Sequence, residues 1–212
     1  MSRSVIALDV TVTSVSIARI AEGEGTPSTG LIVAPPSGRD YSLSATRSRT
    51  DTTAEMVLDA VLSKGLPTLV VMSKLTLGDM TRDPSGGRRA ALWWSITARL
   101  LDAGIPVSEL ATATAMKWLC GHGAVGHKGY AALDRAVRDM WPSVRDRGET
   151  YRMSTVVLAA AGCAVVGIPT AVPATDARMK ALAPIVLPSG WTLQNAKKKE
   201  VSVWVPSESP QP

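Results

Sequence analysis

The sequence has no phenylalanine, two histidines and two cysteines among its 212 residues. Cys120 and Cys163 are too few for the disulfide framework of a small secreted domain, so we expect a reducing compartment and packing roles for both thiols. Cys120, His122 and His127 lie close together, but zinc sites usually have a fuller ligand set with more regular spacing. The composition therefore predicts neither a disulfide-stabilised fold nor a zinc protein.

Long apolar runs are also missing. No segment approaches the ~18 consecutive apolar residues of a membrane helix, and the N-terminus lacks the order of charged, apolar and small residues that defines a signal peptide. We therefore expect a cytoplasmic protein with no membrane partner. A hydrophobic content of 45% over 212 residues is enough for one sizeable core, which favours one α/β domain.

Positive charge is concentrated in the later part of the chain. Residues 1–66 hold 6 basic and 7 acidic side chains, whereas residues 67–212 hold 17 and 11. This excess is typical of a phosphate-binding surface and equally of the solvated surface of a mildly basic protein. The candidate phosphate contacts are Arg88, Arg89, Lys117, Lys128 and Arg135.

The pattern of apolar residues predicts strands first and then alternating helices and strands. Residues 4–10 and 12–20 have the alternation of a β-hairpin with Asp9 near the end of its first strand, and residues 30–34 predict a third strand. Asp51 is the predicted N-cap of the first helix, and residues 68–72 are typical of a strand covered on both faces. Further helices are expected over 85–103, 112–119, 127–141 and 150–166, and a further strand over 105–110.

Four of the six tryptophans raise the question of partners. Trp93 and Trp94 are adjacent on the helix expected over 85–103, where neighbouring positions diverge by about 100°, so at least one ring must face the core. The other ring either packs as well or meets a second subunit. Trp191 and Trp204 lie beyond Pro188 in polar sequence, which predicts a domain over 1–188 and a flexible or partner-binding extension over 189–212.

The order of elements and a set of short motifs resemble the RuvC family of Holliday-junction resolvases, in particular the RuvC-like proteins of actinobacterial phages. The motifs are Arg-Arg-Ala-Ala-Leu-Trp-Trp at 88–94, Ala-Gly-Ile-Pro-Val at 103–107, Thr-Ala-Thr-Ala-Met-Lys-Trp at 112–118, Gly-His-Gly before Lys128, and Leu-Ala-Ala-Ala-Gly at 158–162. The resemblance spans roughly residues 4–188. It implies a ribonuclease H-like α/β fold, a mixed sheet of about five strands flanked by helices, and the host cytoplasm if a phage encodes the chain.

The resemblance also implies an active site of four carboxylates that hold two Mg²⁺ ions about 4 Å apart. Asp9 matches the first carboxylate, whereas Ser73, Tyr151 and Ser154 stand where the other three are expected. Mg²⁺ is normally held through carboxylates, so we expect no cofactor, and Mg²⁺ at Asp9 only if activity survives. The alternative for Asp9 is a turn residue that caps the hairpin. In the family a lysine near the active site contacts DNA, and Lys128 takes that place once a one-residue insertion is allowed.

Three functions stay open. We favour a catalytically degenerate RuvC-like protein that binds branched or duplex DNA without efficient cleavage, with a homodimer matching the symmetry of a four-way junction. The first alternative is a non-catalytic scaffold or virion-associated subunit that contacts another protein through Trp191, Trp204 and the C-terminal tail. The second alternative is an active metal-dependent junction endonuclease whose missing acids come from nearby loops. The acids considered for that role are Asp79, Asp83, Asp146 and Glu149.

Overall fold

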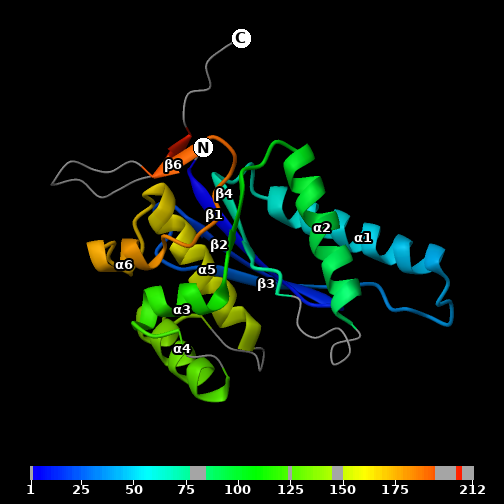
Figure 1. Ribbon diagram of the computed structural model, residues 1–212, viewed down its shortest axis with the longest axis horizontal. Coiled ribbons are helices and arrows are strands. Elements are labelled where there is room, and N and C mark those ends of the chain that lie inside the picture. The colour runs from blue at the N-terminus through cyan, green and yellow to red at the C-terminus, as the bar shows by residue number, and fades with distance from the viewer. Residues whose placement is uncertain (1, 77–84, 124–125, 145–149, 194–203, 207–212) are drawn as a thin grey trace, which may run out of the picture.

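A five-stranded mixed sheet with helices on both faces forms the centre of the computed structural model (Figure 1). The structure describes residues 2–76, 85–123, 126–144, 150–193 and 204–206. Within these ranges, no helix is both long and apolar enough to span a membrane.

The strand order is β3-β2-β1-β4-β5. Strand β1 (Ser4–Val10) pairs antiparallel with β2 (Ser14–Ala21), which pairs antiparallel with β3 (Ser28–Val33). On its other side β1 pairs in parallel with β4 (Leu69–Ser73), and β4 pairs in parallel with β5 (Val107–Leu110). Strands β1 and β4 are central, and their apolar side chains are buried on both faces, as continuous apolar runs predict.

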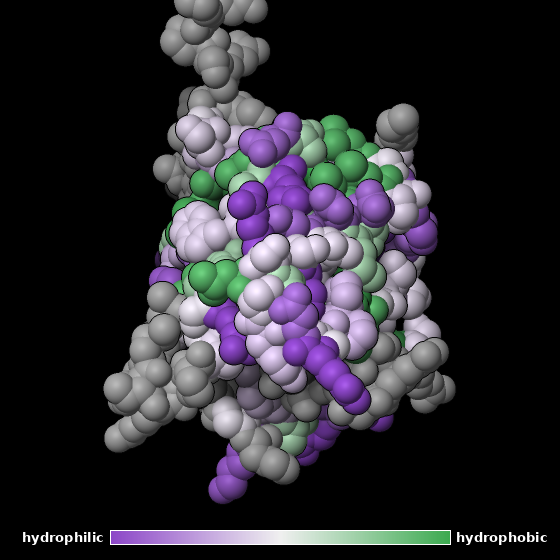
Figure 2. All heavy atoms as spheres, turned by 90° about the vertical axis from the view of Figure 1, so that its right-hand side faces the viewer, coloured by the Kyte–Doolittle hydropathy of each residue, from purple (hydrophilic) through white to green (hydrophobic). Residues whose placement is uncertain are grey.

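Helices α1 (Leu43–Leu62) and α2 (Gly86–Asp102) cover one face of the sheet (Figure 1). Their core residues pack on alternate residues of the central strands, such as Leu8 and Met72. Arg99 of α2 forms ion pairs with Asp51 and Glu55 of α1, at 3.5 and 3.4 Å. Figure 2 shows this side of the molecule with a band of hydrophilic residues down its middle, as expected for a helix pair that faces solvent.

The two adjacent tryptophans of α2 have different surroundings. Trp93 is 6% exposed and belongs to the core, whereas Trp94 is 61% exposed. Their rings meet edge to face, with centroids 4.8 Å apart and an interplanar angle of 80°. The expectation that at least one ring faces the core is confirmed, and the other ring lies on the surface.

The opposite face of the sheet carries the larger core and four helices (Figure 1). These helices are α3 (Thr112–Cys120), α4 (His127–Met140), α5 (Thr150–Val166) and α6 (Asp176–Ala181). Helix α5 lies directly against β1, β2 and β4, and α3 and α4 pack on α5. From Met153 to Val165 almost every residue of α5 is buried, which explains its small and apolar composition.

Gly162 sets the distance between α5 and the sheet. A Cβ atom at this position would lie 2.6 Å from Cγ2 of Val71 and 2.7 Å from Cγ1 of Val5. Glycine therefore permits this approach of the helix to β1 and β4, because an added Cβ would require a shift of the two valine side chains, of the helix or of the strands. Ser154, eight residues earlier, lies about 12 Å along the helix from Gly162 and about 80° around its axis.

We expect Gly162→Ala to lower the free energy of unfolding by about 1–3 kcal/mol, because the added methyl group overpacks the contact with Val5 and Val71. The higher helix propensity of alanine offsets up to about 1 kcal/mol of this loss. Urea unfolding of the variant and the parent measures the difference. The control is Gly25→Ala, whose added Cβ would meet nothing within 4 Å. Equal stability of the Gly162 variant and the parent would contradict the close approach.

Helix α1 begins nine residues earlier than predicted. Ser42, not Asp51, is the N-cap, and its Oγ accepts a hydrogen bond from the backbone N–H of Ala45 at 3.2 Å. Asp51 lies inside the helix, where it pairs with Arg47 at 3.5 Å. The first two turns of α1 are mostly exposed and polar, so they carry no apolar periodicity from which a helix is recognised.

The start of the predicted extension lies against the domain. Strand β6 (Trp191–Leu193) pairs antiparallel with β7 (Trp204–Pro206), and β7 lies against α5. Trp191 is partly buried and packs on the larger core, so the assumption that it is fully exposed was wrong, and its contact with a partner protein stays a prediction. The polar sequence around Trp191 gives no sign that its ring packs against the core. The side chain of Trp204 lies outside the described residues, and the boundary at residue 188 stays a prediction.

Candidate functional site

The alternation of side chains along β1 and β4 places Asp9 beside Ser73. Val5 and Ala7 of β1 face the larger core, and so do Leu69 and Val71 of β4. Asp9 and Ser73 follow on the same face at the carboxyl ends of these two strands, because side chains alternate with a period of two. The parallel register pairs Leu8 with Met72, which puts the next residues of both strands side by side.

Two serine hydroxyl groups hold the carboxylate of Asp9. Ser73 Oγ donates to Asp9 Oδ1 at 2.6 Å, and Ser154 Oγ of α5 donates to Asp9 Oδ2 at 3.4 Å. The indole Nε1–H of Trp93 donates to the backbone carbonyl of Ser73 at 2.9 Å, which fixes the end of β4 from the other face of the sheet. Each carboxylate oxygen thus faces a neutral donor at a position defined by the core.

Burial raises the pKa of Asp9 above its ordinary value of 3.8. The hydrogen bonds from Ser73 and Ser154 and the positive charge of Arg89 act in the opposite direction, but the cost of removing the carboxylate from water is larger. Arg89 itself is held by a hydrogen bond from its Nη2 to the carbonyl of Thr76 at 2.8 Å.

These residues border a small open cavity of about 240 Å³, which we name the Asp9 hollow. Its lining residues are Asp9, Val10, Ser73, Lys74, Leu75, Thr76, Arg89, Trp93, Thr112 and Tyr130. Asp9 is the one carboxylate in this lining, and Lys74 and Arg89 are its two basic residues. The charge of the described lining is therefore positive overall, which suits an anionic ligand better than a divalent cation.

The described side chains do not fit a site for two divalent metal ions. Among the residues that the structure describes, no group of three or more His, Cys, Asp or Glu side chains is placed to hold a metal. Glu109 of β5 is occupied elsewhere, since its Oε1 accepts a hydrogen bond from the backbone N–H of Leu75 at 3.1 Å. The side chain of Tyr151 lies outside the described residues. So do the acids considered as replacement ligands: Asp79, Asp83, Asp146 and Glu149.

No protein-family model and no curated protein matches this sequence, but solved structures match its fold. The structure of RuvC from Thermus thermophilus is 16% identical, with a TM-score of 0.53 over 74% of this chain and 93% of that one. The same protein in complex with a Holliday junction substrate is 14% identical, with a TM-score of 0.51 and the same coverage. The chain has the fold of RuvC. At this identity the likeness concerns the fold alone, and it confirms the ribonuclease H-like sheet expected from the order of elements.

Within this RuvC fold, only part of the predicted DNA-binding set adjoins Asp9. Arg89 lines the Asp9 hollow, whereas Arg88 is exposed and lines a different pocket. Lys128 and Arg135 are exposed on α4, seven residues apart and on one face, and Tyr130 of the same helix reaches the Asp9 hollow. Lys117 lines another hollow beside α6, which shares no lining residue with the Asp9 hollow.

Sequence reasoning missed several groups that line the hollow. Lys74, Thr112 and Tyr130 come from three different segments. Lys74 and Tyr130 belong to none of the motifs above, and Thr112 begins the motif at 112–118 but was not assigned to the site. At least one of Trp93 and Trp94 was expected in the core, but the hydrogen bond of Trp93 to the end of β4 has no sequence signal. Lys74, two residues after the predicted strand 68–72, was an available hint, since ligands often bind at the carboxyl ends of parallel strands.

We expect Asp9→Asn to raise the free energy of unfolding near neutral pH. The folded state raises the pKa of Asp9, so the folded protein binds more protons than the unfolded chain between the two pKa values, and stability falls as the pH rises through this window. The amide removes the buried charge and keeps an oxygen that accepts from Ser73. The gain should shrink as the pH falls toward 3.8, the ordinary pKa of aspartate.

Urea unfolding at two pH values, one near neutral and one near 4, measures this difference. The control is Asp134→Asn, because Asp134 is ion-paired with Arg138 at 3.0 Å on the surface of α4 and its loss should cost a little stability. A loss of stability in Asp9→Asn at neutral pH would show that the ionised carboxylate is favoured where it lies.

Proposed function

We propose that this chain is a catalytically degenerate protein of RuvC fold that binds branched or duplex DNA without efficient cleavage. The observation that carries the proposal is the set of groups around Asp9. Its two oxygens accept from Ser73 and Ser154, which stand at two of the three further positions where the family resemblance expects carboxylates. Hydroxyl groups in their place leave one negative charge where two divalent ions would need several.

The same hollow keeps groups that suit a nucleic-acid backbone. Arg89 and Lys74 line it, and Lys128 is exposed in the first turn of α4, two residues before the lining residue Tyr130. Guanidinium and ammonium groups bind phosphate without help from a metal ion. Loss of the acids therefore removes the chemistry of cleavage and leaves the means of binding, which is the reason that we favour a DNA-binding role.

A homodimer is part of the proposal. Trp94 is 61% exposed and Leu101 is 56% exposed, and both project from α2 at a separation of seven residues, which corresponds to one helix face. Exposed large apolar side chains on one face favour an interface, and a twofold interface is the usual arrangement for a small oligomer. Two copies joined in this way would present two DNA-binding faces to the arms of a four-way junction.

Binding should depend strongly on salt and on the exposed basic residues of α4. We expect Lys128→Ala and Arg135→Ala to weaken binding to a labelled four-way junction, and each lost phosphate contact should reduce the slope of log affinity against log salt by about 0.9. Fluorescence anisotropy between ~50 and ~200 mM salt measures both quantities.

The matched control is Arg138→Ala on the same helix, because Arg138 is paired with Asp134 through its own side chain. Undetectable binding by the parent at ~50 mM salt, or equal effects of all three substitutions, would favour the scaffold alternative.

The parent protein should not cut four-way junctions in Mg²⁺ or Mn²⁺, because the described groups around Asp9 include no second carboxylate. Gel analysis of labelled junction strands tests this expectation. Metal-dependent nicking that disappears in Asp9→Ala would favour the active-nuclease alternative. Acids outside the described residues would then be the candidate metal ligands.

Restoring the missing acids should create a metal site. We expect Mn²⁺ to raise the melting temperature of the triple variant Ser73→Glu, Tyr151→Asp and Ser154→Asp, but not that of the parent. The carboxylates would crowd around Asp9 and repel one another until a cation binds, and a ligand that binds only the folded state stabilises it. A folded triple variant without a metal-dependent shift would mean that the matched positions are wrong.

A further inference from the structure

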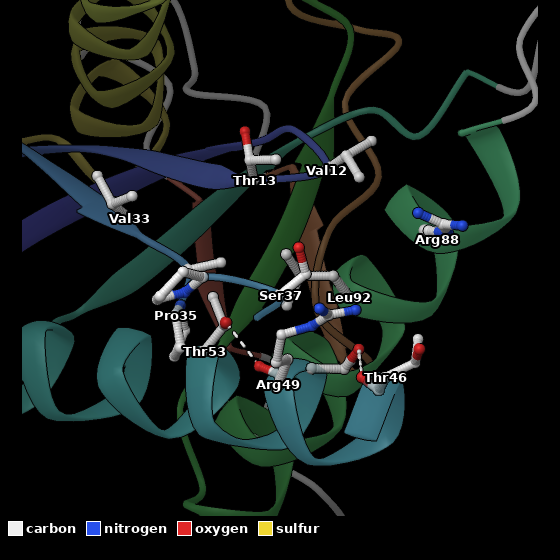
Figure 3. A pocket seen from close by; sticks show the side chains of 13 residues that line it. Val12, Thr13, Val33, Pro35, Ser37, Thr46, Arg49, Thr53, Arg88 and Leu92 are labelled. Atoms are coloured by element: carbon white, nitrogen blue, oxygen red, sulfur yellow. Dashed lines mark hydrogen bonds between the residues drawn. The ribbon is translucent and has the colours of Figure 1, made fainter. Parts of the chain in front are cut away.

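A second pocket, of about 350 Å³, lies between one end of the sheet and the helix pair α1 and α2 (Figure 3). We name it the arginine pocket. Its walls come from the β1–β2 turn, the segment that follows β3, the first half of α1 and the beginning of α2. The lining residues used below are Val12, Pro35, Arg49, Thr50, Arg88 and Leu92.

Arg49 is the most unusual group of this pocket. Figure 3 shows its side chain rising from α1 into the space beside Ser37 and Leu92. Its Nη1 atom is buried and has no hydrogen-bond partner. A buried guanidinium donor without an acceptor is costly, and polar groups left in this way in native proteins commonly await a ligand, an ion or a water molecule.

Arg88 supplies a second guanidinium group from the other side of the pocket (Figure 3). Among the described residues, neither Arg49 nor Arg88 belongs to an ion pair. No carboxylate lines the pocket, and the remaining lining groups are apolar side chains, prolines and hydroxyls. The charge of Arg49 contributes to lowering the pKa of Asp40, but no ion pair between them is formed. Two arginines that face one cavity and have no ion-pair partner among the described residues suit an anion, and their planar forks match the oxygens of phosphate.

The arginine pocket adjoins the Asp9 hollow through two elements. Arg88 and Arg89 are consecutive on α2 and diverge by about 100°, so one guanidinium serves each cavity. On the sheet, Val10 lines the Asp9 hollow and Val12 lines the arginine pocket. The first turn of α2 and the end of β1 therefore separate two neighbouring basic cavities on one edge of the molecule.

We propose that the arginine pocket binds a phosphate group, and that together with the Asp9 hollow it forms a track for successive phosphates of one DNA strand across the first turn of α2. The DNA source of the phosphate rests on the proposed function, whereas the pocket itself does not. Arg49 and Arg88 are the residues that hold the phosphate.

The test uses the full chain and the variants Arg49→Met and Arg88→Met, which keep an apolar stem and remove the charge. The matched control is Arg47→Met, because Arg47 lies two residues from Arg49 on the same helix, is exposed, and pairs with Asp51. In the first arm, melting temperatures are compared in inorganic phosphate and in chloride at equal ionic strength. Phosphate should stabilise the parent and Arg47→Met, and this shift should be clearly smaller in Arg49→Met and Arg88→Met, where only the Asp9 hollow remains to bind the anion.

The second arm measures anisotropy of a labelled four-way junction and of a labelled single strand over a range of salt. Arg49→Met and Arg88→Met should bind more weakly than Arg47→Met. Loss of one phosphate contact should flatten the slope of log affinity against log salt by about 0.9 for duplex arms and about 0.7 for the single strand.

The two arms separate the possible failures. Loss of the phosphate shift without any change in DNA affinity would support the pocket and overturn the DNA track, leaving a free phosphorylated ligand as the occupant. If the parent binds no DNA, the proposed function fails, and the first arm still decides the pocket. Arg49→Met and Arg88→Met that match Arg47→Met in both arms would overturn the proposal. Arg88 is exposed, so Arg88→Met should fold, and it tests the pocket in both arms even if Arg49→Met does not fold.

Discussion

The close approach of α5 to β1 and β4 is the constraint on which the site depends. Gly162 lets the helix backbone lie against the side chains of Val5 and Val71, which sets a short distance between the helix and the sheet at this point. Two turns earlier, this distance places Ser154 within reach of Asp9. A larger residue at 162 would move the helix outward and would leave Asp9 with Ser73 as its main donor.

The balance of charge around Asp9 follows from this packing. The Asp9 carboxylate is partly buried because it lies near the end of the central strand β1, and burial disfavours its ionised form. Serine hydroxyls and Arg89 reduce this penalty, although they do not remove it. In a nuclease of this fold the same place would collect negative charge for metal ions. Here the described groups supply one acid and two bases, a composition that suits the binding of an anion.

Much of the fold was accessible to sequence reasoning, because burial leaves a periodic signature. The hairpin that carries Asp9, the central strand that ends at Ser73 and the apolar helix α5 were all predicted close to their observed positions. The early start of α1 and the packing of Trp191 were not. The exposed polar turns at the start of α1 carry no apolar pattern from which a helix is predicted. A single aromatic residue in polar sequence does not indicate whether its side chain packs against the core.

The sequence by itself determined the type of sheet, the residue types at the matched acid positions and the excess of basic side chains. These are properties of the residues and of their local spacing, which a chain displays whether or not it is folded. Only the tertiary structure decided which side chains meet: Ser154 and Ser73 at Asp9, Trp93 at the end of β4, and Arg49 with Arg88 in one pocket. Such contacts join residues up to 145 positions apart in the chain, and they are set by the distances between packed layers.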